Sequence, residues 1–169
     1  EPYRRQRQMC IRDRSMNQEG QRRILDYYEP KESFTRKCFP DVEGVCYVIS
    51  RSGCQVAFLN DRKLSSAYKK YEKRGQLLEE ILMGTQKRAL MHADVLGQKT
   101  LRQKLMTYFQ FLNRQKGRDG FSLPFSYTDC ADYLFVDRSA MMRELGRMKE
   151  EGLIRTEGKK IWLEEKKLR

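Results

Sequence analysis

The sequence has no apolar run that approaches the roughly 20 residues that a membrane-spanning helix needs. Its opening also lacks a short apolar core followed by a small-residue cleavage site, so we do not expect a secretory signal. These two absences predict a cytoplasmic protein.

Residues that build catalytic and metal sites are scarce. The 169 residues include one histidine, His92, which leaves general acid–base chemistry without its usual agent. The sequence shows no nucleophile–base pair, no metal-ligand spacing and no glycine-rich phosphate loop. We therefore expect no enzyme, no metal site and no cofactor.

The five cysteines include no C-x-x-C pair, and their odd number argues against a disulfide framework and a zinc knuckle. Cys38, Cys46 and Cys54 are spaced eight apart, which leaves a redox role open. Free cysteine usually behaves as a small buried apolar residue, and all three lie in strand-like sequence, so we favour a packing role.

Positive charge is abundant and unevenly placed. The chain carries 35 Lys and Arg against 23 Asp and Glu, and six of the basic residues lie between Gly97 and Arg118 without a single acid. Such a stretch attracts polyanions because binding releases counterions. A solvated basic face would have the same composition, so charge alone leaves nucleic acid and simple solubility both open.

The first fifteen residues have no periodic pattern of apolar side chains and contain five arginines. The run from Met9 to Asp13 resembles the translation of an adapter used to prepare sequencing libraries. We expect residues 1–15 to be a non-native leader, which we exclude from the expected fold, with the protein's own sequence beginning near Met16. A natural basic arm that touches the DNA backbone is the alternative.

Residues 16–62 have the pattern of β-structure. Strand-like runs at 24–28, 45–50 and 54–59 are separated by turn sequences, the first at 29–32. Three or four antiparallel strands of this kind make a partial β-roll with one uncovered apolar face. The residues expected on that face are Tyr27, Tyr47, Val48, Val56 and Phe58.

Residues 63–96 are assigned to a linker and a long helix. From about residue 76, one set of side chains recurs at alternating steps of four and three, the spacing of a seam between two packed helices. We expect a homodimer along this seam, the alternative being one face of an ordinary core helix. The seam residues are Leu78, Leu82, Thr85, Ala89, His92 and Leu96.

Two short helices with clear start signals follow. Ser126 and Asp129 can form a capping pair before a helix over residues 127–134. Asp137 can then cap a helix over residues 138–150.

The pattern around these helices completes a recognisable motif. A longer helix is expected over residues 99–115, Gly152 ends the last helix, and residues 154–163 read as a hairpin. Helix, tight turn, helix and hairpin predict a winged helix-turn-helix over residues 97–169. Its expected core consists of Leu105, Leu112, Leu123, Leu134, Met141, Leu145, Ile154 and Trp162.

The helix over residues 138–150 carries side chains suited to base edges. With its apolar residues buried, its first turns are free to enter a DNA major groove, where arginine can bond guanine O6 and N7 in a fork. We expect Arg138, Ser139 and Arg143 to contact bases. Lys159, at the hairpin tip, can bind phosphate as a point charge.

The segments 125–129, 136–140, 143–145 and 150–154 resemble the Crp/Fnr family of transcription regulators. The resemblance covers residues 20–163 and is strongest after Leu96. It implies an α+β fold: a jelly-roll remnant of a cyclic-nucleotide-binding-like β-roll, a long dimerisation helix and a C-terminal winged helix-turn-helix. It also implies a homodimer that binds double-stranded DNA at a two-fold-related site. The family's base contacts fall on Arg138, Ser139 and Arg143, and its phosphate contacts on Ser126, Tyr127, Thr128 and Lys159.

The sequence departs from the family's pattern in its β-region. Only the second half of the β-roll is recognisable, so we expect an N-terminally truncated member. The run from Phe34 to Pro40 lacks the family's Gly-Glu pair, and the run from Glu43 to Cys46 lacks the arginine that would bind a cyclic phosphate. We therefore expect a sequence-specific regulator that does not respond to cAMP.

A second hypothesis is a small-molecule or redox sensor with a degraded effector site and secondary DNA binding. RNA polymerase as a further partner, the identity of any effector, the operator and the choice between activation and repression stay open.

Overall fold

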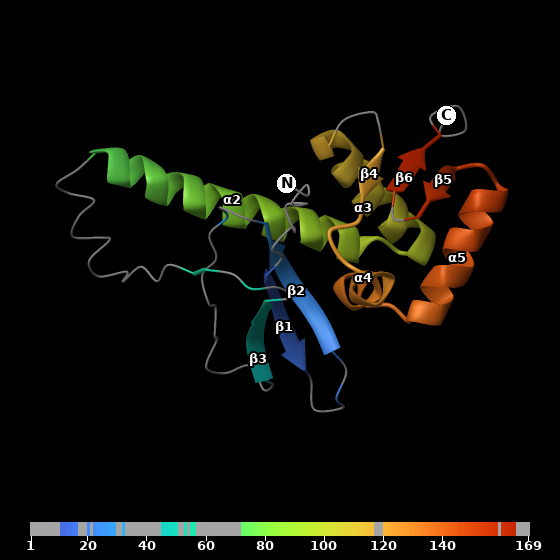
Figure 1. Cartoon of the computed structure of the whole chain (residues 1–169), viewed down its shortest axis with the longest axis horizontal. Helices are drawn as coiled ribbons and strands as arrows, with labels where there is room; N and C mark the ends of the chain where they lie inside the picture. Colours follow the sequence, from blue (N-terminus) through green and yellow to red (C-terminus); the bar gives the residue numbers. More distant parts are fainter. Residues whose placement is uncertain are drawn as a thin grey trace, which may run out of the picture. The chain divides into compact units, whose positions relative to one another are not determined.

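The computed structural model describes residues 11–16, 20, 22–29, 32, 45–50, 53, 55–56, 72–116, 120–158 and 160–164. The chain divides into two units, residues 1–20 with 25–90 and residues 21–24 with 91–169. Helices and separate antiparallel sheets make up the described residues, as Figure 1 shows. The expected α+β class is confirmed.

A three-stranded sheet with the order β2-β1-β3 belongs to the N-terminal region. Its strands are β1 (Ile11–Met16), β2 (Arg22–Tyr28) and β3 (Val45–Ser50). β1 pairs with β3 in antiparallel register, with Ile11 opposite Ser50 and Met16 opposite Val45. The strands predicted over residues 24–28 and 45–50 are therefore confirmed.

The middle strand was not predicted, because it lies mostly in the leader. Residues 11–15 have no apolar alternation, but backbone hydrogen bonds pair strands whatever their side chains are. Residues 11–15, which we had excluded from the expected fold, therefore form part of this sheet. That this segment is non-native stays a prediction.

The strand expected over residues 54–59 falls largely outside the described residues. Of the two that are described in that run, Gln55 and Val56, neither lies in a strand. The expected uncovered face is only partly open: Val48 and Val56 are exposed, Tyr47 is half-buried, and Phe58 is not among the described residues. Tyr27 is buried, which contradicts the expectation for that residue.

One residue of a long helix contacts the end of β2. Arg88 of α2 (Glu72–Gly97) forms ion pairs with Asp26 at 3.2 Å and with Glu32 at 3.5 Å. Its guanidinium carbon also lies 5.0 Å from the ring centre of Tyr28.

Among the described residues, no helix is both long and apolar enough to cross a membrane.

The second unit contains the remaining helices and a three-stranded antiparallel sheet with the order β4-β6-β5. The predicted bounds of the two short helices agree with the structure, and so does the hairpin. The two-residue strand β4 is too short to show a pattern in the sequence. The elements are α3 (Leu101–Lys116), β4 (Phe121–Ser122), α4 (Tyr127–Leu134), α5 (Arg138–Glu150), β5 (Ile154–Glu157) and β6 (Lys160–Leu163).

The core of this unit is strongly aromatic. The ring centres of Tyr108, Phe125 and Tyr133 lie 5.2–6.3 Å apart, and Phe109 and Phe121 meet at 5.5 Å. All the predicted core residues are buried except one. That one is Trp162, which is half-buried, while its neighbour Ile161 is fully buried. Successive residues of a strand point to opposite faces, so Ile161 takes the inner position on β6.

Candidate nucleic-acid interface

The two short helices are fixed by the caps that the sequence predicts. The Ser126 hydroxyl accepts a hydrogen bond from the Asp129 amide at 3.2 Å and donates one to the Asp129 carboxylate at 2.6 Å. The Asp137 carboxylate accepts a hydrogen bond from the Ala140 amide at 2.7 Å. α4 and α5 therefore begin where local chemistry dictates.

A single residue makes the turn between these helices tight. Phe135 has a left-handed backbone, with φ at 55°, and its amide donates to the Ala131 carbonyl. A bulky side chain in this region costs on the order of 1–3 kcal/mol, so surrounding contacts must hold it. The Phe135 ring meets the His92 ring edge-on at 5.7 Å, and the Arg23 guanidinium lies 5.1 Å from its centre.

One face of α5 is polar and exposed. Arg138, Ser139 and Arg143, the three predicted base contacts, are all exposed on it. The apolar residues that recur along α5, Met141, Leu145 and Met148, are buried as predicted. The structure thus brings the predicted base-contacting side chains together on the first turns of one capped helix.

Sequence reasoning missed Met142, which lies in the middle of this face. Its side chain is 39% exposed, although α5 buries its other methionines. Gly146, one turn further along, leaves open space beside it, since a Cβ atom there would meet nothing within 4 Å. The signal was present in the sequence: Met142 falls outside the apolar period set by Met141, Leu145 and Met148.

The four predicted phosphate-contacting residues differ in how far their side chains are exposed. Thr128 is exposed and Tyr127 is half-buried, and burial raises the pKa of the Tyr127 phenol, which favours a neutral donor. Ser126 is exposed, but its only hydroxyl proton is already directed to Asp129. Lys159 lies outside the described residues.

The thiol of the cysteine in α4 is buried away from solvent. Cys130 of α4 is buried, and desolvation, followed by the charge of Asp129, raises the pKa of its thiol to about 12. Because the thiolate is the reactive form, Cys130 is a packing residue.

The predicted seam on α2 is only partly available. His92 is buried: its ring stacks on Tyr133 at 3.9 Å, and its Nε2–H donates to the Tyr133 carbonyl at 2.8 Å. His92 thus packs within its own chain, and its assignment to the seam is wrong. Thr85 and Leu96 are half-buried, and the side chain of Leu78 lies outside the described residues.

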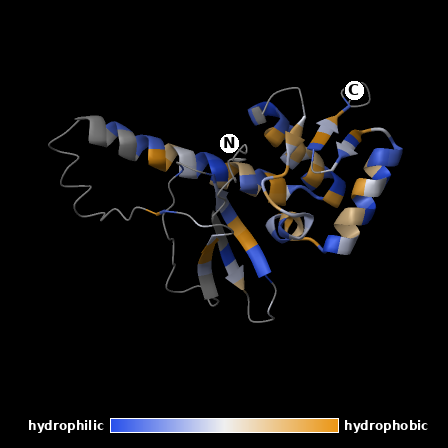
Figure 2. Cartoon of the chain, viewed as in Figure 1, coloured by the Kyte–Doolittle hydropathy of each residue, from blue (hydrophilic) through white to orange (hydrophobic). Residues whose placement is uncertain are grey.

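The exposed apolar face of α2 lies beside the predicted seam and shares two residues with it. Figure 2 shows hydrophobic positions between hydrophilic ones along this helix. Leu82, Met83 and Leu90 have exposed fractions of 56–63%. The large and small apolar residues exposed on this face are Leu82, Met83, Ala89, Leu90 and Ala93.

Comparison with known families decides what the C-terminal unit is. A family model described as the Crp-like helix-turn-helix domain matches residues 103–169. These residues are a Crp-like helix-turn-helix domain. The predicted family resemblance is confirmed for this part of the chain.

The chain is also similar in fold to solved regulators of the Crp/Fnr family and related proteins. FixK2 from Bradyrhizobium japonicum matches with a TM-score of 0.65 and 20% identity, covering 92% of this chain and 80% of its own. A putative Crp/Fnr-family regulator from Eubacterium rectale gives 0.57 and 13%, covering 92% and 74%. CprK complexed with OCPA gives 0.70 and 16%, covering 92% and 76%. No curated protein sequence matches significantly.

The hairpin of the Crp-like domain is anchored by a close approach between Gly120 and Trp162. Gly120 has a φ of +81°, and a Cβ atom there would lie 2.6 Å from the indole Nε1. Gly120→Ala should therefore lower the free energy of unfolding by about 1–3 kcal/mol, because the rigid indole must move. Denaturant unfolding of the whole chain measures this loss.

Gly158→Ala is the matched control for the backbone contribution. Gly158 has a φ of +56°, but a Cβ atom there would meet nothing within 4 Å, so only the left-handed backbone is penalised. The packing explanation fails if the two variants lose the same stability.

Proposed function

We propose that this chain is a sequence-specific regulator of transcription that binds double-stranded DNA as a homodimer. The observation that carries the proposal is the exposed face of α5, where Arg138, Ser139 and Arg143 project from a capped helix. An α-helix fits the major groove, and its N-terminal turns reach the base edges.

The side chains suggest a division of labour. Arg138 and Arg143 can each bind guanine O6 and N7 through a bidentate fork, and Ser139 can donate to or accept from a base edge. The start of α4 would lie on the phosphate backbone, where the N-terminal end of the helix and the exposed Thr128 hydroxyl favour an anion. Such contacts position the protein, whereas the base contacts select the sequence.

The apolar face of α2 supports the homodimer. Leu82, Met83 and Leu90 are large, apolar and more than half exposed, and apolar side chains grouped in this way on one helix face are often covered by a partner. A two-fold dimer places two α5 helices in successive major grooves. The DNA site would then consist of two related halves about one helical turn apart.

We also propose that the chain does not respond to cAMP. The sequence lacks the Gly-Glu pair and the arginine that would bind the cyclic phosphate, although these positions lie largely outside the described residues. Calorimetric titration with cAMP should give no binding heat and no change in DNA affinity. Saturable binding with an effect on DNA affinity would contradict this part.

The proposal is tested by comparing preferred and unrelated duplexes. Selection from a random pool should yield a preferred sequence, bound at physiological salt at least about 10³ times more tightly than unrelated DNA. Fluorescence anisotropy of both duplexes in one buffer gives this ratio. A ratio near one would leave only a general affinity of a basic protein for a polyanion.

Met142 adds a prediction about base composition. Its exposed side chain can contact the C5-methyl group of thymine, the one apolar feature of the major groove. Replacing the contacted thymine with deoxyuridine removes one methyl group and should weaken binding about fourfold, the effect of ~0.8 kcal/mol.

Met142→Ala should abolish this difference between thymine and deoxyuridine, while Met142→Leu, which stays apolar, should keep it. If wild-type binding is insensitive to deoxyuridine at every thymine of the site, Met142 reads no methyl group.

A further inference from the structure

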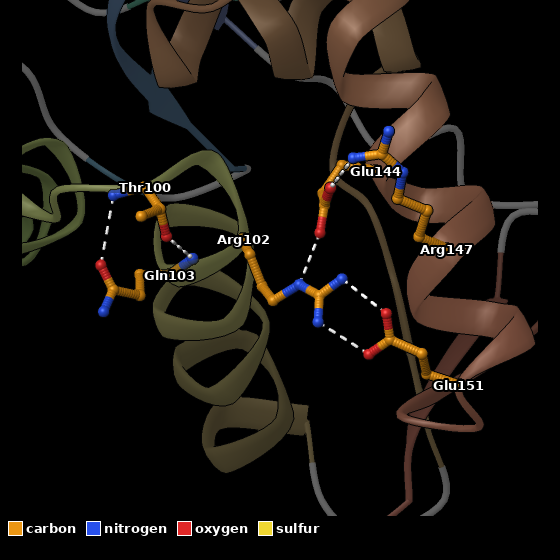
Figure 3. Close-up of polar contacts among 6 residues, drawn as sticks. All are labelled: Thr100, Arg102, Gln103, Glu144, Arg147 and Glu151. Atoms are coloured by element: carbon orange, nitrogen blue, oxygen red, sulfur yellow. Dashed lines mark hydrogen bonds and ion pairs between the residues drawn. The ribbon is translucent and has the colours of Figure 1, made fainter.

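An arginine at the start of α3 holds α5 at two separate points. The Arg102 guanidinium binds Glu151 through a fork, with Nη1 and Nη2 each 2.7 Å from a carboxylate oxygen. Its Nε donates to the Glu144 carboxylate at 2.5 Å. Figure 3 shows all three bonds radiating from one side chain. Arg102, one of the six basic residues between Gly97 and Arg118, therefore forms ion pairs with two acidic residues.

The spacing of the two carboxylates gives this contact a directional effect. Glu144 lies in the middle of α5 and Glu151 at its C-cap, seven residues or about two helical turns apart. One contact would allow the helix to pivot, whereas two contacts to one planar group define the direction of its axis. The apolar contacts of Met141, Leu145 and Met148 hold the helix down but are not directional.

Arg102 is itself held in place. The Thr100 hydroxyl accepts a hydrogen bond from the Gln103 amide, and the Gln103 side chain accepts one from the Thr100 amide, each at 3.2 Å. This reciprocal cap, also drawn in Figure 3, fixes the first turn of α3 around Arg102. The guanidinium therefore projects from a fixed backbone.

The contact lies away from the exposed face of α5. Residues of a helix follow one another at about 100°, so Glu144 lies about 200° and Glu151 about 180° around the axis from Met142. The N–H groups of Arg102 that face α5 are already bonded to carboxylates. Arg102 therefore contacts α5 on the side opposite Met142 and leaves the exposed face of the helix uncovered.

We propose that Arg102 is a positioning residue for DNA reading, which fixes the axis of α5 so that Arg138 and Arg143 meet the base edges together. This inference rests on the proposed function of α5. The planar fork is essential to it, because a lysine ammonium cannot bind both oxygens of Glu151 and also Glu144 in one fixed geometry.

The test compares Arg102→Gln and Arg102→Lys in the full chain. For each variant, anisotropy gives the affinities for the preferred and an unrelated duplex over a range of salt concentrations. Arg102→Gln should lower the ratio of the two affinities about tenfold, with the affinity for unrelated DNA and the salt slope unchanged. Arg102→Lys, which keeps the charge but not the fork, should lie between Arg102→Gln and the wild type.

Arg147→Gln is the matched control. Arg147 also pairs with Glu144, at 3.4 Å, but its side chain is 67% exposed and makes a single contact from α5 itself. Its loss removes the same charge and should leave the affinity ratio within about twofold of the wild type.

Three results would overturn the inference. An unchanged ratio in Arg102→Gln means that the contact does not orient α5. Equal weakening on both duplexes with a salt slope smaller by about one means that Arg102 binds phosphate directly. If the wild type itself does not distinguish the two duplexes, the proposed function fails and the inference falls with it, whereas the first two results leave that function intact.

Discussion

Arg143→Ala should weaken binding to the preferred duplex by about 1–3 kcal/mol and relax base choice at one position of each half-site. Arg143 is exposed in the second turn of α5, beside Met142, where a guanidinium can reach a guanine. Alanine leaves the buried face of α5 intact, so folding should not change. Repeating the selection from a random pool with this variant shows both effects.

Lys149→Ala is the control for simple loss of charge. Lys149 is exposed in the last turn of the same helix, far from the expected base contacts. Any weakening should be the same for all duplexes, and the selected sequence should not change. An Arg143→Ala variant that also selects the wild-type sequence would mean that α5 is not the reading helix.

Leu82→Glu combined with Ala89→Glu should convert a dimer into monomers. Both residues are exposed and lie seven positions apart on the same face of α2, so a two-fold interface would bring four carboxylates together without partners. Losing the second half-site should also reduce affinity for the full DNA site by about 10²–10⁴-fold, the usual gain from bivalent binding.

Sedimentation velocity of the wild type and the double variant measures the change in assembly. Lys87→Glu is the control, because Lys87 is exposed on the same helix but lies about 140° around the axis from Leu82. Because Lys87 lies at the edge of the apolar face, one turn from Met83, this variant should weaken the dimer far less than the double variant does. An undisturbed dimer in the double variant would place the interface elsewhere.

The sequence predicted the short helices well because their start signals are local. Ser126 with Asp129, and Asp137 with Ala140, are each three residues apart, so the chain specifies these caps without long-range contacts. The apolar period of α5 likewise identifies its buried side, and what remains outside that period is the candidate interface.

The errors come from contacts between residues far apart in the chain. His92 has the spacing of a seam residue, but in the structure it stacks on Tyr133, 41 residues later, and hydrogen-bonds to the carbonyl of that residue. The basic stretch after Gly97 contains no acid, and the acids that pair with Arg102 lie 42 and 49 residues further along the chain. Charge composition shows neither partner.

The N-terminal sheet shows a different kind of limit. Strand pairing of residues 11–15 depends on backbone groups, which leave no trace in a sequence without apolar alternation. The contact that Tyr28 makes could not be foreseen either, since the helix that carries Arg88 lies about sixty residues further along the chain.

We expect α5 to read base edges in the major groove of a two-fold DNA site. Methylation interference on the selected duplex measures this, because a methyl group on guanine N7 blocks the position that an arginine fork would bind. Interference should occur at two symmetry-related groups of guanines about one helical turn apart. Binding that tolerates methylation at every guanine would contradict it.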